Sequence, residues 1–265
     1  MFESSDEKAL AQCIRDYAHK LAEKALALDH TPGPDFNKNI HKLRVTLKRL
    51  GASWRLMRYT VSSETYEHAK VRLRDTRQLL SKARDQAVLG KIISRYSSSE
   101  DVGVPGKINT EIDWEKINTL IQAEITAWEK MEFRFRDTRP VNKGLHHTYR
   151  RVKKLGDEAQ EKSARPEQRH EWRKWVKHLF YQLKILRHCG IKGYKKTIAR
   201  LETLGEELGR EHDLDVLQRF AKSSGLPDSV SIIEQARREK SAIREQVRER
   251  YKSGFAKKAR KLVEK

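Results

Sequence analysis

The residues of this sequence that could do chemistry are mostly basic, and they recur in one spacing. The pattern H-x-x-R-x-x-x-K begins at His41 and again at His170, 129 residues later. Residues three and four positions apart lie on one face of a helix. Each copy therefore places an imidazole, a guanidinium and an ammonium group side by side, a combination that suits the oxygens of a phosphate.

A helical wheel separates these groups from the apolar residues of the same two segments. The predicted basic faces consist of His41, Arg44, Lys48 and Arg55 in the first copy, and of His170, Arg173, Lys177, Tyr181 and Lys184 in the second. The predicted apolar faces consist of Leu43, Leu47, Leu50, Trp54 and Met57, and of Trp172, Val176, Leu179, Leu183 and Leu186. We expect both apolar faces to be core.

Two further segments repeat this separation of charge. One predicted basic face holds Lys143, His146, His147, Arg150 and Lys154, and the other holds Lys70, Arg74, Arg77 and Arg84. A solvated helix face usually alternates Glu with Lys to relieve repulsion, whereas these faces carry like charges. Such repulsion is tolerated where an anion is to be bound.

The whole composition favours a polyanionic partner. Lys and Arg total 57 against 37 Asp and Glu, which gives a net charge of +20 and a pI of about 9.9. Nucleic acid, an anionic membrane surface and a phosphate polymer all fit this charge. No apolar stretch reaches membrane-spanning length and no signal peptide is evident, so we expect a cytoplasmic protein without membrane insertion. Cys13 and Cys189 lack paired spacing and are expected to be reduced thiols.

The elements that must position these residues are predicted to be helices throughout, because strand alternation is absent. The predicted helices span residues 5–28, 36–59, 63–94, 113–136, 142–162, 167–188, 193–222 and 228–262. A break near 136–144 divides the chain into halves, residues 1–137 and 138–265. The segments "LLSKARDQAVL" and "ELGREHDLDVL" align Asp85 with Asp213, 128 residues later, which nearly equals the first offset. We therefore expect one all-α domain made of two duplicated, pseudo-symmetric helical bundles.

The duplicated pattern, the two downstream segments and the central segment "GLHHTYRRVKKL" (144–155) together resemble the CHAD domain, the conserved histidine α-helical domain. This resemblance implies two helical bundles whose basic surfaces meet in a cleft or pore that binds inorganic polyphosphate. It assigns binding to His41, Arg44, Lys48 and Arg49 in the first half, and to His170, Arg173, Lys177 and Tyr181 in the second.

The two halves are not equivalent. Lys70, Arg74 and Arg77 of the first half align with Ile198, Glu202 and Gly205 of the second, so the expected site is asymmetric. Asp85 and Asp213 are interpreted as partners of nearby arginines or as helix caps.

A binding protein fits this sequence better than an enzyme. Glycine-rich phosphate loops, nucleophile–base pairs and carboxylate clusters for magnesium are all missing, and neither a cofactor nor a metal is expected. Two alternatives stay open: binding of a nucleic-acid backbone, and a phosphohistidine carrier that uses His41 or His170. The five tryptophans lie mostly on apolar faces, with Trp175 the least certain, and this disfavours stacking on bases.

The sequence thus predicts non-catalytic binding of polyphosphate in the cytoplasm, with association to polyphosphate granules. The predicted site consists of His41, Arg44, Lys48, Arg49, Arg55, Lys70, Arg74, Arg77, Arg84, Lys143, His147, Arg150, Lys154, His170, Arg173, Lys177, Tyr181 and Lys184.

Overall fold

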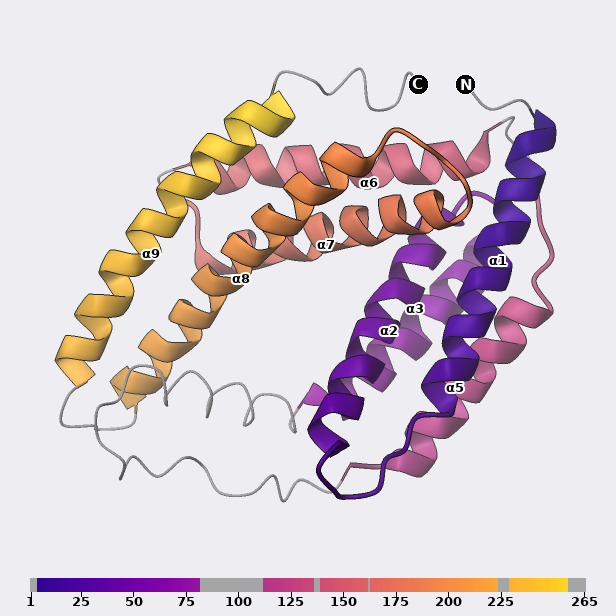
Figure 1. Cartoon of the computed structure of the whole chain (residues 1–265), viewed down its shortest axis with the longest axis horizontal. Coiled ribbons are helices and arrows are strands. Elements are labelled where there is room, and N and C mark those ends of the chain that lie inside the picture. Colours follow the sequence, from indigo (N-terminus) through magenta and orange to yellow (C-terminus); the bar gives the residue numbers. More distant parts are fainter. Residues whose placement is uncertain (1–3, 82–111, 136–138, 162, 224–228, 257–265) are drawn as a thin grey trace.

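The structure is a computed structural model of the chain, and it describes residues 4–81, 112–135, 139–161, 163–223 and 229–256. Every regular element within these ranges is helical (Figure 1). The prediction of an all-α fold is therefore confirmed for this part of the chain. The elements are α1 (Ser4–Leu26), α2 (Phe36–Leu56), α3 (Ser63–Leu79), α5 (Trp114–Glu129), α6 (Pro140–Gln160), α7 (Pro166–His188), α8 (Lys195–Ser223), α9 (Ser229–Tyr251) and a π-helical turn (Lys252–Ala256).

Local signals fix where several of these helices begin. Ser62 Oγ accepts the N–H of Thr65 at 3.1 Å, and Asp113 Oδ1 accepts the N–H of Lys116 at 2.9 Å, so both residues are N-caps. α6 and α7 begin with proline, whose missing N–H costs nothing at that position.

Two predicted boundaries need comment. The helix predicted over 113–136 is too long, because α5 ends at Glu129. Beyond it the N–H of Arg134 bonds to Thr60 O at 2.6 Å, which takes the chain out of the helical path. α3 ends at Leu79, and the rest of the predicted helix 63–94 falls largely on residues 82–111, outside the described part.

Helices α1, α2, α3 and α5 pack together (Figure 1), and Trp54 and Trp128 lie in their core. Trp54 and Trp128 are fully buried, with ring centroids 4.1 Å apart. Both indole N–H groups donate to the buried carboxylate of Glu124, which also pairs with Arg72 at 3.1 Å. Burial raises the pKa of Glu124, while Arg72 and the two indoles oppose this rise.

The last four helices, α6 to α9, form the other part of the molecule. Their core contains the predicted apolar face of α7, all of which is buried. Beside it lies the carboxylate of Glu211, which accepts from Arg169 Nη2 at 2.7 Å and from Arg244 Nε at 2.8 Å. A buried carboxylate is stable here because two guanidinium groups compensate its lost hydration.

The two parts are joined at several points. α2 and α6 pack so closely that a Cβ at Gly144 would lie 2.1 Å from Leu56 O, so only glycine permits this contact. At the N-terminus of α6, Glu7 of α1 caps the first turn by accepting the N–H of Val141 at 3.0 Å. α1 therefore belongs to the first bundle and also holds the second in place.

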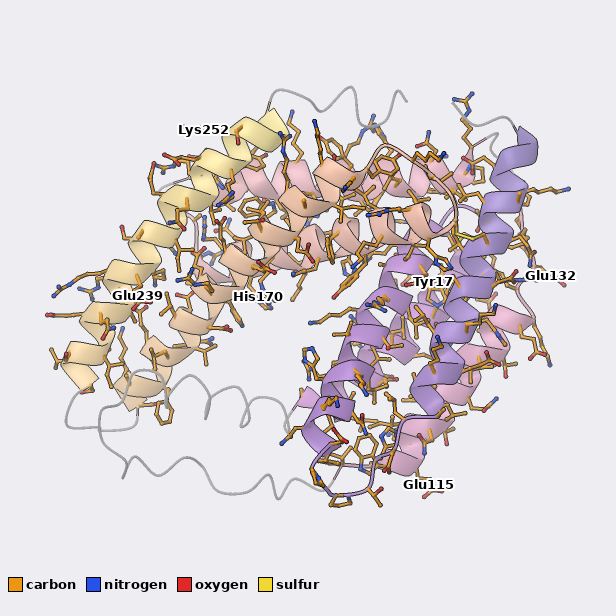
Figure 2. The ribbon with its side chains drawn as sticks, in the orientation of Figure 1. Tyr17, Glu115, Glu132, His170, Glu239 and Lys252 are labelled. Carbon is orange, nitrogen blue, oxygen red and sulfur yellow. A yellow bond between two sulfur atoms is a disulfide. The ribbon has the colours of Figure 1, made fainter. Side chains whose placement is uncertain are left out.

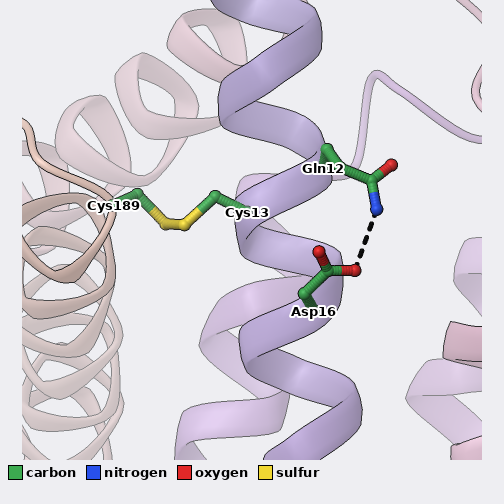
Figure 3. The surroundings of a disulfide bond; sticks show 4 residues. All are labelled: Gln12, Cys13, Asp16 and Cys189. Carbon is green, nitrogen blue, oxygen red and sulfur yellow. Dashed lines mark hydrogen bonds between the residues drawn. A yellow bond between two sulfur atoms is a disulfide. The ribbon is translucent and has the colours of Figure 1, made fainter.

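The prediction of reduced thiols is wrong for this structure. Cys13 of α1 and Cys189, directly after α7, form a disulfide with Cα atoms 5.9 Å apart (Figure 3). The two residues are 176 positions apart, and only the packing of α1 on α7 brings them together. Their spacing in the sequence could not reveal this contact.

No helix in the described ranges is both long enough and apolar enough to cross a membrane.

The disulfide should stabilise the protein under oxidising conditions. Closing a loop across 176 residues removes chain entropy from the unfolded state that amounts to about 5 kcal/mol. We expect Cys13→Ser to lower the free energy of unfolding by about that amount in guanidinium titrations without reductant. With dithiothreitol present, the wild type and the variant should unfold at the same denaturant concentration. Equal midpoints without reductant would contradict the bond.

Candidate anion-binding site

The crossing of α2 and α7 positions the central part of the site. At Gly51 of α2 a Cβ would lie 3.9 Å from Cε1 of His178 on α7, so the imidazole sits directly against α2. Close by, Gln182 Nε2 donates to Thr148 Oγ1 of α6 at 3.0 Å and to Ala52 O of α2 at 3.4 Å. These buried bonds tie three helices together at the crossing.

Three basic side chains from three helices converge here, and we call them the junction cluster: Arg55 of α2, Arg77 of α3 and His178 of α7. His178 is only 8% exposed, and its Nδ1 is buried without a hydrogen-bond partner in the described ranges. Arg55 Nε is likewise buried without a partner, although Nη1 lies 3.3 Å from the Tyr66 hydroxyl. Arg77 Nε donates to Leu73 O at 2.7 Å. Among the described residues, neither guanidinium forms an ion pair with a carboxylate.

The cluster is electrostatically unfavourable when it is empty. Burial lowers the pKa of Arg77, and the charge of Arg55 lowers it further. Burial also holds the pKa of His178 well below its ordinary range, with additional lowering by Arg55, Arg77, Lys174 and Lys48. A bound anion would relieve this repulsion, and the repulsive free energy that is removed would add to the affinity for the anion.

Trp175 of α7 borders the cluster and is partly buried. The guanidinium of Arg55 lies 4.6 Å from the centre of its ring, and that of Arg151 lies 5.9 Å from it. Its indole N–H donates to Glu171 at 3.0 Å. The ring therefore already packs against cations of the protein, as in a cation–π contact.

α6 extends the basic surface beyond Trp175. His147 Nε2 lies 3.0 Å from Arg58 Nη1, and Lys143 Nζ lies 4.8 Å from the centre of the Tyr59 ring. Burial lowers the pKa of His147, and Arg58, Arg55 and Arg151 lower it further. This imidazole is thus neutral at neutral pH and able to accept a hydrogen bond.

A second group of side chains lies beside the C-terminal part of α7. Tyr17 of α1, labelled in Figure 2, forms a hydrogen bond with the side chain of Arg49 of α2. The positive charge of Arg49 also lowers the pKa of Tyr181 of α7. Burial raises the pKa of both phenols, and Arg49 only partly offsets this. Both hydroxyls therefore keep their protons and can donate to an anion.

Two glycines of α8 make room for the basic face of α7. A Cβ at Gly205 would lie 2.8 Å from Lys177 Cε, and one at Gly209 would lie 3.2 Å from Arg173 Nη2. Burial lowers the pKa of Lys177, and Arg173 adds to this, while Glu206 and Glu202 raise it. In the sequence, Gly205 aligns with Arg77 of the first half. The expected asymmetry of the two halves stays a prediction.

His170 does not reach the junction cluster. Its ring stacks against His212 of α8, with centroids 4.2 Å apart, in the second part of the molecule (Figure 2). Both imidazoles line a hollow of about 690 Å³ that also contains Glu167, Asp215 and Lys240. The mixed charges of this hollow distinguish it from the junction cluster.

The remaining predicted site residues have varied surroundings. Arg44 Nη1 donates to Leu80 O at 3.1 Å. Lys70 and Arg74 are exposed and pair with Glu67 at 2.6 Å and Asp75 at 2.9 Å. The exposed members are His41, Arg150, Lys154 and Lys184, and Arg84 lies outside the described residues.

Sequence reasoning missed several residues of this surface, chiefly His178, Arg58 and Tyr17. His178 lies eight positions after His170, at the border of the predicted basic face of α7, and this spacing was a usable signal. Tyr17 gave no signal, because its role depends on the packing of α1 against α7.

Several enclosed carboxylates are paired with cations outside the cluster. Glu124 pairs with Arg72, Glu211 with Arg169 and Arg244, and Asp215 with Lys240 at 2.9 Å. Neither Arg55 nor Arg77 belongs to these pairs. The chain thus separates structural ion pairs from the basic residues at the crossing. Asp213 is partly buried and Asp85 lies outside the described residues, so their structural role stays a prediction.

The pairing of Glu211 leads to a test of stability. Glu211→Gln should leave Arg169, only 7% exposed, without its carboxylate and lower the free energy of unfolding by about 3–5 kcal/mol. Glu245→Gln on α9 breaks an exposed pair with Arg248 and should cost less than about 1 kcal/mol. Guanidinium titrations of both variants make the comparison, and equal losses would contradict a structural role for Glu211.

The sequence model of the CHAD domain matches residues 8–222 of this chain. No curated protein and no solved structure matches it. The matched range contains both copies of the H-x-x-R-x-x-x-K pattern and all three members of the junction cluster, and it covers well over half of the chain. The resemblance seen in the sequence is thereby confirmed, and this chain belongs to the CHAD domain family.

Proposed function

We propose that this protein binds inorganic polyphosphate without transforming it. The observation that carries the proposal is the junction cluster, in which the charge of Arg55 acts on Arg77, both side chains are partly buried, and neither pairs with a carboxylate among the described residues. Proteins rarely bury like charges unless something compensates them. A phosphate group supplies the opposite charge and the acceptor oxygens that both guanidinium groups need.

A polymer suits the site better than a single phosphate. Further basic residues lie on the same helices: α7 carries Lys177 and Arg173, whose charges act on each other, and α6 carries Lys143 and Arg151, whose guanidinium lies 5.9 Å from the Trp175 ring. Each internal phosphate of polyphosphate carries one negative charge, so a chain can satisfy many cations at once. Release of its counterions adds to the affinity, as it does for nucleic acids.

We infer that the binding groove arises from a duplication. In each half the helix with the H-x-x-R-x-x-x-K pattern packs between two neighbours, α2 between α1 and α3 and α7 between α6 and α8. The two patterned helices also pack on each other. This arrangement supports a pseudo-symmetric pair of repeats, residues 1–137 and 138–265, with a basic groove at their junction.

The proposed protein binds the polymer without catalysis, and the proposal also concerns where in the cell the protein lies. In the described ranges, no group of three or more His, Cys, Asp or Glu residues is placed to hold a metal ion. The proposed ligand predicts a position at polyphosphate granules in the cytoplasm.

Nucleic acid is the second candidate, because its backbone offers the same phosphates. Every Trp, Tyr and Phe side chain that the structure describes is buried or partly buried. Single-stranded nucleic acids are bound largely by stacking on aromatic rings. The surface therefore favours a phosphate chain that has no bases.

Charge reversal on the facing helices tests where the polymer binds. Arg44→Glu and Arg173→Glu should each weaken polyphosphate binding about tenfold or more, because a charge-assisted hydrogen bond is replaced by repulsion. The control is Arg237→Glu on α9, an exposed position with the same change of net charge. Arg244 is unsuitable as a control, because it pairs with the buried Glu211. Equal effects of all three reversals in fluorescence titrations would mean that binding is diffuse.

Ionic strength and competition test the nature of the ligand. The affinity for long-chain polyphosphate should fall steeply with added salt, because binding releases counterions. At physiological salt, polyphosphate should displace a labelled DNA duplex from the protein, whereas the same phosphate concentration of DNA should not displace polyphosphate. The reverse order of displacement would favour a nucleic-acid-binding protein.

A further inference from the structure

His178 differs from the other histidines that the structure describes. It is the most enclosed of them, it lies at the crossing of α2 and α7, and its Nδ1 is buried without a hydrogen-bond partner in the described ranges. Buried polar atoms without partners are uncommon, and each calls for an explanation. Neither the core nor the family pattern that begins at His41 and His170 accounts for this imidazole.

The charges that act on His178 most strongly are all positive, and they come from three helices. α2 contributes Lys48 and Arg55, α3 contributes Arg77, and α7 itself contributes Lys174. α6 acts from further away, because its Arg151 and His147 contact the Trp175 ring, which lies 5.9 Å from the imidazole.

Glu171, a carboxylate of the same helix as His178, already has other partners. Glu171 accepts from Lys174 Nζ at 3.2 Å and from Trp175 Nε1 at 3.0 Å. It therefore does little to favour a proton on His178, and the imidazole is neutral in the empty protein.

We propose that His178 takes up a proton when polyphosphate occupies the junction cluster, and so acts as a proton-accepting residue of the binding site. This inference rests on the proposed function and adds a regulation to it. Phosphates placed against Arg55 and Arg77 compensate the charges that keep His178 neutral. The imidazole then binds a proton from solvent, and the resulting cation adds to the attraction for the polymer.

The sign of the pH effect follows from this sequence of events. The proton is bound in the complex at pH values at which it is absent from the empty protein. Affinity is therefore lowest above the pKa of His178 in the complex. It rises as the pH falls through that pKa, and it levels off below the lower pKa of the empty protein.

The wild-type protein allows a direct test by NMR. The imidazole C–H signal of His178, assigned by its loss in His178→Gln, is followed over pH with and without long-chain polyphosphate. We expect the titration midpoint to move to higher pH when the polymer is bound. A midpoint that stays in place while the polymer binds would overturn the inference.

Calorimetry provides the second test. Polyphosphate is titrated into the protein in two non-phosphate buffers that differ in ionisation enthalpy, which gives the number of protons exchanged on binding. The wild type should take up about one proton more per site than His178→Gln, and its affinity should rise about tenfold more between pH 8 and pH 5.5. The matched control is His68→Gln, an exposed position on α3 outside the site, which should behave as the wild type.

The outcomes separate the two proposals. Equal proton uptake by the wild type and His178→Gln, with both binding the polymer, would refute the role of His178 and leave the proposed function intact. Absence of binding by the wild type would refute the proposed function itself. Circular dichroism of the variant shows whether it is folded. The NMR titration itself is made on the wild type, and the variant serves only to assign the His178 signal.

Discussion

Repulsion among the basic groups at the crossing of α2 and α7 is the constraint that the rest of the structure must balance. The junction cluster collects charges from three helices in a partly buried space, and this arrangement lowers the pKa of both Arg77 and His178. Among the described residues, no carboxylate pairs with Arg55 or Arg77 to offset this repulsion. The helices are held in place by contacts elsewhere, chiefly the Trp54–Trp128–Glu124 core and the Arg169–Glu211–Arg244 network.

This balance explains how the carboxylates are distributed. The sequence has 37 acidic residues, enough to neutralise many of its basic ones. Several enclosed acids nevertheless pair with Arg72, Arg169 and Lys240, which do not belong to the cluster. Structural stability and anion affinity are thus assigned to different arginines, which lets the cluster remain unpaired without unfolding the protein.

Much of the fold follows from local pattern. The apolar faces predicted from Leu43 to Met57 and from Trp172 to Leu186 are buried, because a helix with one apolar face removes it from water by packing that face against the core. The same wheel placed Arg55 and Arg77 on basic faces, and the structure brings these two together. What the sequence could not provide depends on contacts between distant segments. The pairing of Cys13 with Cys189, the approach of Tyr17 to α7 and the enclosure of His178 all require the relative placement of helices that no periodicity encodes.

The position of α1 has a mechanical consequence. This helix reaches the second bundle at several points, among them Glu7 at the start of α6 and Cys13 at the end of α7. The contact of Gly144 with Leu56 is a further attachment between the bundles. Attachments at several separate points restrain the angle between the bundles as well as their distance. The basic residues of the two bundles are then held at restrained separations, and a flexible polymer must adapt its own path to them.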